Sequence, residues 1–206
     1  MEIRSGLYVL LVLLSSNGRT QVAKGPNLVR ETLDVAVADL LKANKVSGGI
    51  EIFAGCKPFE EKTFEIVDRP LDSALARLAQ AEPSLSWRKN EKTYLATIKL
   101  VDSPSLTAAK LPPLQLKVRT LWQATDSLLQ HRATQNRVAE LKLSSGPEHL
   151  GTSSIYERDE RTISLPAGTL QDDLNTVAAA FGSAMWQLNQ RECGETRTFR
   201  LSWIAR

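Results

Sequence analysis

One stretch of this chain occurs twice, and it limits the possible folds more than any other feature. FEIVDRPLDSALARLAQAEPSLSW, from Phe64 to Trp87, aligns without gaps with ISLPAGTLQDDLNTVAAAFGSAMW, from Ile163 to Trp186. In each copy the apolar residues alternate, then recur at helical spacing, then alternate again, which predicts a strand, a helix and a second strand. The predicted core of the repeat consists of Leu71, Leu75 and Trp87 in the first copy and of Leu170, Leu174 and Trp186 in the second.

The sequence that follows each copy extends it into a β-hairpin. After Trp87 a polar turn leads into the alternating run 94–100, and after Trp186 a second alternating run ends at the C-terminus. The second hairpin is predicted to have the longer tip, from Asn189 to Thr196.

The sequence that precedes each copy also contains a helix and a strand. In the first half, Asn27 is predicted to cap an amphipathic helix that ends near Asn44, and a strand follows at 49–53. In the second half, a strand at 114–118 precedes helical sequence at 123–143, broken near residue 133.

These patterns predict an α+β fold with two tandem βαββ-type units, whose helices pack on small mixed sheets. A length of 206 residues is sufficient for two domains of about 100 residues. The segment Ser103–Pro113 is rich in proline and small residues and shows no periodicity, so we place a linker at 105–113. The first unit then covers 19–104 and the second unit covers 114–206.

Local signals fix the ends of the two repeated helices. Pro70 stands where a first helical turn accepts proline best. Thr169 and Asp172 have the spacing of a capping box, and Gly182 is expected to end the second helix.

The N-terminus has the order of a secretory signal peptide. A basic start is followed by the apolar run Leu7–Leu14 and then by small residues, so we predict a signal peptide at 1–18, with Ala23 as the alternative cleavage site. The run is too short to cross a bilayer as a mature anchor, which needs about 20 residues. The alternative is a buried first strand. The predicted location is therefore outside the cytoplasm, in the periplasm or secreted.

The chain has two cysteines, Cys56 and Cys193. In an oxidising compartment they are the candidate partners of a disulfide that closes a long loop and stabilises the fold by roughly 5 kcal/mol. The alternative is two separate thiols.

No arrangement of residues in the sequence indicates chemistry. The net charge of +3 is spread along the chain, which does not favour a nucleic-acid surface. His131 and His149 belong to no metal or catalytic motif, and the glycines match no phosphate-binding loop. The paired acids Glu60–Glu61 and Asp172–Asp173 suit solvent and a helix N-terminus better than proton transfer. We therefore predict no catalytic residues, no metal and no cofactor.

The repeated unit resembles the secretin and TonB short N-terminal domain, whose pattern is an F-x-[IL] strand, a helix L-x-x-A-L-x-x-[LV]-A, and a strand with a hairpin. The first copy matches at Phe64, Ile66, Leu71, Ala74, Leu75, Leu78, Ala79, Leu85 and Trp87. The second matches at Ile163, Leu165, Leu170, Leu174, Val177, Ala178 and Trp186, with Asp173 in place of the small helix residue. The resemblance implies an α+β periplasmic module that engages partner proteins.

The function expected from these observations is that of an exported, non-catalytic interaction module for another cell-envelope protein, bound through a sheet edge or a helix face. The alternative is a binder of a small ligand or cell-wall fragment in the groove between the two units. An enzyme of unrecognised type is the third hypothesis.

Overall fold

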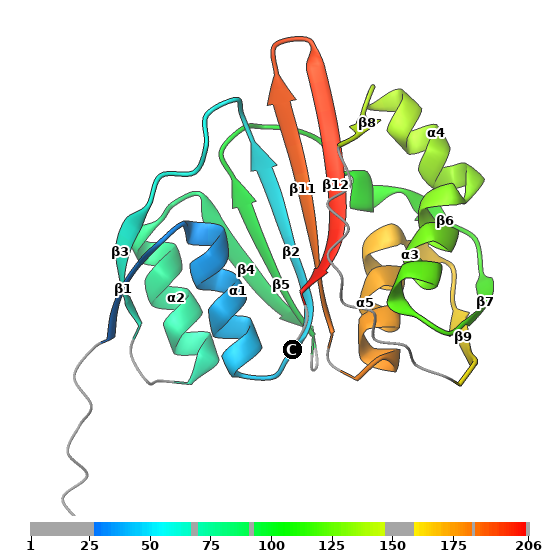
Figure 1. The fold of residues 1–206 in the computed structure, drawn as a ribbon, viewed down its shortest axis with the longest axis horizontal. Coiled ribbons are helices and arrows are strands. Elements are labelled where there is room, and N and C mark those ends of the chain that lie inside the picture. Colours follow the sequence, from blue (N-terminus) through cyan, green and yellow to red (C-terminus); the bar gives the residue numbers. More distant parts are fainter. Residues whose placement is uncertain (1–26, 67–69, 91–92, 147–158, 183, 205–206) are drawn as a thin grey trace, which may run out of the picture.

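The protein is a mixed α+β structure built around one six-stranded sheet (Figure 1). The computed structural model describes residues 27–66, 70–90, 93–146, 159–182 and 184–204, so the predicted signal peptide and His149 lie outside the described residues. Within that part the helices are α1 (Leu33–Ala43), α2 (Leu71–Ala81), α3 (Leu121–Gln130), α4 (Arg132–Glu140), α5 (Leu170–Ala180) and a short 3-10 helix, η1 (Leu106–Ala108). None of these helices combines the length and the apolar character that a membrane span requires.

The large sheet takes strands from both halves of the chain. Its order is β4 (Leu85–Asn90), β5 (Thr93–Lys99), β2 (Ser47–Ala54), β11 (Met185–Cys193), β12 (Thr196–Ile204) and β8 (Ser144–Ser145). The hairpins β4–β5 and β11–β12 are antiparallel, whereas β5–β2, β2–β11 and β12–β8 are parallel. The halves therefore meet in the sheet itself, along the central parallel pair β2–β11.

Three short antiparallel pairs flank the large sheet. They are β1 (Asn27–Glu31) with β3 (Lys62–Ile66), β6 (Lys110–Leu111) with β10 (Gly168–Thr169), and β7 (Leu114–Val118) with β9 (Arg161–Leu165). Small mixed sheets were predicted, but the two hairpins and β2 are united in a single sheet.

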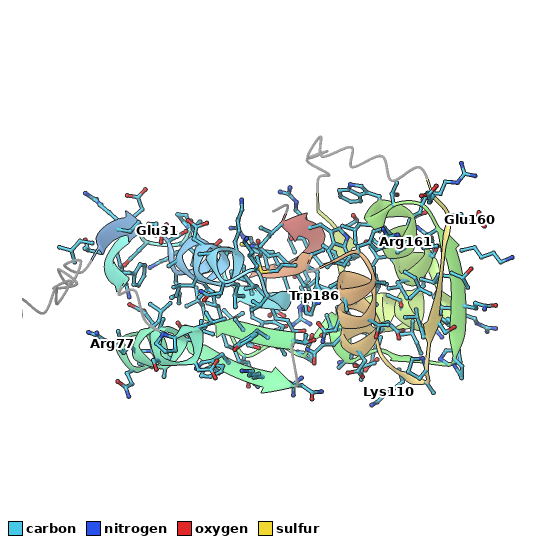
Figure 2. The ribbon with its side chains drawn as sticks, turned by 90° about the horizontal axis from the view of Figure 1, so that it is seen from below. Glu31, Arg77, Lys110, Glu160, Arg161 and Trp186 are labelled. Carbon is cyan, nitrogen blue, oxygen red and sulfur yellow. The ribbon has the colours of Figure 1, made fainter. Side chains whose placement is uncertain are left out.

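Helices cover both faces of this sheet, which gives three layers (Figure 2). Ile50, Ile52 and Ile98 belong to one apolar cluster with α1 and α2, whereas Leu95 and Trp186 belong to a second cluster with α3 and α5. Successive residues of a strand point to opposite faces, so the two clusters lie on opposite sides of the sheet. β2 is buried almost along its whole length, as expected of a strand that is covered on both faces.

Two glycines in β2 are required by this packing. Gly48 has φ +149°, and a Cβ added there would lie 1.8 Å from the Tyr94 carbonyl oxygen of the neighbouring strand. A Cβ at Gly49 would lie 2.0 Å from the Trp186 ring. The strand predicted at 49–53 begins two residues earlier, at Ser47, so both glycines belong to the central strand.

Most of the predicted helices and strands are present with small shifts. The capping box is confirmed, because the Thr169 hydroxyl accepts from Asp172 N and Asp172 accepts from Thr169 N. Gly182 follows the end of α5 with φ +75°. His131 separates α3 from α4 and accepts a hydrogen bond from Ala133 N at 3.2 Å, which is an N-cap role.

Two predictions about element boundaries were wrong. Asn27 does not cap the first helix, because residues 27–31 pair with β3 as strand β1 and Thr32 occupies the N-cap position of α1. The second hairpin has no long tip, because β11 runs to Cys193 and β12 starts at Thr196. The tight turn between them is possible because Gly194 has φ +59°.

The segment expected to be a linker is packed into the protein. Leu106 is fully buried, and Thr107, Ala109 and Leu111 are also buried. Gln190 on β11 accepts from Leu106 N at 2.6 Å and donates to the Pro104 carbonyl at 3.1 Å. This segment therefore belongs to the core and contacts both halves of the chain.

Candidate binding site

An open part of the large sheet lies beside α5. Ser86 on β4 pairs with Thr97 on β5, and Thr97 pairs with Glu51 on β2, so these residues form one row across a single face of the sheet. Leu95, which lies on the same face, belongs to the apolar cluster that contains α5. α5 contacts β2 and β11, whereas Ser86 on β4 is exposed and Thr97 on β5 is half-buried, so this face is open toward β4.

A cavity of about 310 Å³ occupies this uncovered part. It is lined by Glu51, Ser86, Trp87, Arg88, Leu95, Thr97 and Gln171. Gln171 comes from α5 and all the others come from the first half of the chain, so both halves contribute to the cavity. The Arg88 guanidinium donates to the Gln171 side-chain oxygen and connects β4 to α5 at the edge of the cavity.

A buried carboxylate lies at the base of this cavity. Glu51 is only 6% exposed, and its Oε1 accepts hydrogen bonds from the hydroxyls of Ser105, at 2.9 Å, and Thr107. The segment 103–107 is held further by Ser103 Oγ, which donates to Glu192 Oε1 at 2.6 Å, and by Arg137, which donates to the Ser105 carbonyl. These contacts hold the base of the cavity in place.

Basic side chains lie at the rim near the start of α5. Burial opposes ionisation of Asp172, but hydrogen bonds from Thr169 and the charges of Lys110 and Arg88 hold the pKa of this carboxyl below its usual range. Arg88 is exposed on β4 and supplies a positive charge at the edge of the cavity, whereas the exposed Lys89 forms an ion pair with Asp72 at 3.5 Å.

β4 forms one edge of the large sheet, and none of the described residues pairs with its outer side. Lys99 N donates to the Ser84 carbonyl at 2.8 Å. Backbone groups of an antiparallel strand alternate in direction, so those of Ser86 and Arg88 face β5 while those of Trp87 and Lys89 face outward. The six-residue strand β4 thus offers the Leu85 carbonyl and the backbone groups of Trp87 and Lys89 for pairing with another strand beside the cavity.

The side of β4 that faces α2 is fixed by an aromatic and ionic contact. Trp87 stacks on Tyr94 with 6.2 Å between ring centroids, and Lys89 Nζ lies 5.1 Å from the Tyr94 ring centroid. Tyr94 Oη donates to Asp72 Oδ1 at 2.6 Å. This hydrogen bond and the charge of Lys89 lower the pKa of Asp72, although burial opposes the change. The edge strand is therefore anchored to α2 and rests in a defined position.

The residues predicted to form the core of the repeat lie in the interior of the protein, with one exception. Leu71, Leu75, Leu170, Leu174 and Trp186 are buried, whereas Trp87 is half-buried on the edge strand. Cys56 and Cys193 are free thiols, one exposed and the other half-buried. Glu51, Arg88 and Gln171 were not predicted as site residues, because they are far apart in the chain and meet only when the sheet forms.

In the described part of the chain, no group of three or more histidine, cysteine, aspartate or glutamate side chains is placed to hold a metal ion. Glu61 forms an ion pair with Arg30 at 3.4 Å, on the exposed surface. Comparison with protein-family models, with curated proteins and with solved structures found no match to this chain.

Gln190 allows a direct test of how the segment 103–107 is held. Replacing Gln190 with alanine leaves the buried Leu106 N–H and the Pro104 carbonyl without this partner, and an unsatisfied buried group costs about 1–3 kcal/mol. We expect Gln190→Ala to lower the free energy of unfolding by about 2 kcal/mol in urea denaturation. Gln187→Ala, on the same strand but half-buried, is the matched control and should change it by less than about 1 kcal/mol. Equal effects of the two substitutions would show that Gln190 does not hold the segment.

Proposed function

We propose that this protein is an exported, non-catalytic interaction module made of two tandem units of the secretin and TonB short N-terminal type. It binds an extended segment of another cell-envelope protein at the outer edge of β4. The observation that supports this function best is the free six-residue edge of β4 beside a cavity lined by both halves. The proposal of export rests on the N-terminal sequence alone.

The order of pairing in the two halves supports the idea of two tandem units. The hairpin β4–β5 is joined by β2 in parallel with β5, and the hairpin β11–β12 is joined by β8 in parallel with β12. An antiparallel pair precedes each hairpin, β1–β3 in the first half and β7–β9 in the second. In this interpretation β4 corresponds to β11.

This correspondence suggests how a partner strand is bound. The outer edge of β11 is occupied by β2, in parallel, from Met185 opposite Gly48 to Arg191 opposite Ala54. The outer edge of β4 has no such neighbour among the described residues. A segment of the partner protein would take the same place on β4, also in parallel, with main-chain hydrogen bonds giving affinity and the cavity receiving one side chain. The exposed Arg88 at the cavity favours a partner segment that carries an acidic residue there.

A proline at Lys89 tests this binding mode. The Lys89 N–H faces outward, so Lys89→Pro removes a donor that the partner strand needs without removing a bond to β5. We expect Lys89→Pro to lose the proteins that the wild-type chain captures from an envelope extract, in an affinity experiment read by quantitative mass spectrometry.

The matched control is Lys89→Ala, which removes the same side chain and keeps the N–H. This variant should retain most of the capture, and circular dichroism should show that both variants keep the fold. If Lys89→Pro captures the same proteins at the wild-type level, the binding site is not the β4 edge.

The cavity itself favours a second candidate function, binding of a small ligand or a cell-wall fragment between the two units. Its volume of about 310 Å³ is at the lower end of the range for small-molecule sites. A rise in melting temperature with soluble disaccharide-peptide fragments of cell wall would support this function. The rise should be unchanged in Lys89→Pro, which alters only the strand edge, and smaller in Arg88→Ala, which removes a side chain that lines the cavity.

A further inference from the structure

The two cysteines lie at the same level of the central parallel pair, β2 and β11. The last paired residues of this ladder are Ala54 and Arg191. Cys56 lies two residues beyond Ala54, and Cys193 lies two residues beyond Arg191. Continued register would therefore place Cys56 opposite Cys193. Neighbouring strands are about 4.8 Å apart, and Cα atoms joined by a disulfide are about 4.4–6.8 Å apart.

Side-chain contacts agree with this placement. The Cys56 thiol points toward the backbone next to Cys193. Its Sγ lies 3.9 Å from the Glu192 carbonyl oxygen, which is within hydrogen-bond range for sulfur. A side-chain hydrogen bond with Cys56, burial and the charge of Cys56 raise the pKa of the Cys193 thiol. The two thiols are thus neighbours in the folded chain although they are far apart in the sequence.

Reagents can reach this pair from the solvent. Cys56 is exposed and lies on the wall of a cavity of about 340 Å³ at the carboxyl end of β2. The apolar part of that wall is formed by Leu33, Phe59, Leu100 and Val101. Cys193 is only half-buried at the end of β11. This cavity is on a different part of the sheet from the proposed binding edge, since the two cavities share no lining residue.

We propose that Cys56 and Cys193 are a redox-active modification site, which a disulfide-bearing oxidant converts into an intramolecular disulfide between the ends of β2 and β11. The Cys56 thiolate attacks one sulfur of the oxidant, forms a mixed disulfide and releases one thiol. The Cys193 thiolate then attacks the Cys56 sulfur, which forms the internal bond and releases the second thiol. The pair loses two protons and two electrons, and the oxidant takes up the electrons as its own disulfide is reduced.

The chemical order of these steps follows from the two environments. Cys56 is the first nucleophile because it is exposed, whereas the raised pKa of Cys193 lowers its thiolate fraction. The resulting bond connects the two halves of the chain at the same end of the central pair and fixes one wall of the cavity. It also closes a long loop in the unfolded chain, which favours the folded state.

The test uses the full chain, reduced and then treated with oxidised glutathione under native conditions. Free thiols are alkylated in denaturant, and the product is analysed by intact mass and by non-reducing peptide mapping. We expect a monomer without alkylation, with one peptide pair that joins Cys56 to Cys193, and a denaturant midpoint that rises on oxidation and returns on reduction.

Single serine variants distinguish the pair from two independent thiols. Cys193→Ser should stop at a stable glutathione adduct on Cys56, and its denaturant midpoint should not rise as the wild-type midpoint does. Two alkylated cysteines in the oxidised wild-type chain, glutathione on both cysteines, or a disulfide-linked dimer in place of the internal bond would each overturn the proposal. The result does not depend on the β4 edge, because it is read on the isolated chain.

Discussion

Replacing Gly49 with alanine is expected to lower the free energy of unfolding by at least about 3 kcal/mol, which corresponds to a fall in melting temperature of roughly 10 °C. The added Cβ would lie 2.0 Å, 2.2 Å and 2.4 Å from three ring atoms of Trp186. Trp186 has no exposed surface, and its Nε1 donates to Asn175 Oδ1 at 2.9 Å. Figure 2 shows this ring between α5 and the central strands, so the indole cannot move away from the new methyl group without displacing the helix.

The matched control is Gly55→Ala, which lies just past the end of the same strand. A Cβ there would have Val101 Cγ1 as its nearest neighbour at 3.5 Å, an ordinary contact, so the free energy of unfolding should change by less than about 1 kcal/mol. Urea denaturation of both variants measures the difference. If Gly55→Ala lowers the free energy of unfolding as much as Gly49→Ala does, contact with the indole is not the reason that Gly49 is required.

A double variant tests whether the indole is the cause. Trp186→Leu alone should be destabilising because it leaves a cavity in the core, but it also creates room beside Gly49. The combined Gly49→Ala and Trp186→Leu variant should therefore lose less stability than the sum of the two single losses. Strict additivity would contradict direct contact between the new methyl group and the ring.

The role of Gly49 was not predictable from the sequence, although much of the local structure was. The helices α2 and α5 and their adjoining strands were predicted because apolar spacing and caps act over a few residues. The contact of Gly49 with Trp186 depends on β2 pairing with β11, and that pairing joins residues from opposite ends of the chain. A pair of glycines before an alternating run looks the same at a turn and in a buried strand.

The candidate site was hidden for the same reason. Glu51 and Gln190 occupy positions that a strand pattern assigns to a polar face, but the segment 103–107 covers them. That segment has no periodicity, because its side chains are buried by contacts from both halves and not by one face of a regular element. The free edge of β4 follows from strand order, which the spacing of apolar residues does not determine.

The second large effect concerns Asp173, which is buried in α5 with 1% of its surface exposed. Within the described part of the chain, neither of its carboxylate oxygens has a hydrogen-bond partner. Burial, and to a lesser extent the charge of Asp172, raises the pKa of Asp173 to about 6. A partnerless buried carboxylate is costly when charged, so the folded state retains the proton to higher pH than the unfolded chain does.

The consequence for stability follows from the direction of this shift. Well below pH 4 the carboxyl is protonated in both states, so its raised pKa no longer changes the free energy of unfolding. Between about pH 4 and pH 6 the unfolded chain releases its proton first, so the free energy of unfolding falls as the pH rises. Above pH 6 the loss levels off, and a shift of about two pH units corresponds to roughly 3 kcal/mol.

We therefore expect Asp173→Asn to raise the free energy of unfolding by about 2–3 kcal/mol at pH 7.5 and to leave it nearly unchanged at pH 4. Asp172→Asn is the matched control on the adjacent residue. Asp172 is exposed and accepts hydrogen bonds from Thr169 N at 2.9 Å and Thr169 Oγ1 at 2.6 Å, so its loss should lower the free energy of unfolding at pH 7.5 by about 1 kcal/mol. Urea denaturation of both variants at the two pH values measures these changes. If the buried carboxylate is unpaired, the two substitutions change the free energy of unfolding in opposite directions at pH 7.5. Destabilisation by Asp173→Asn at both pH values would instead indicate that Asp173 is held by a partner in the folded protein.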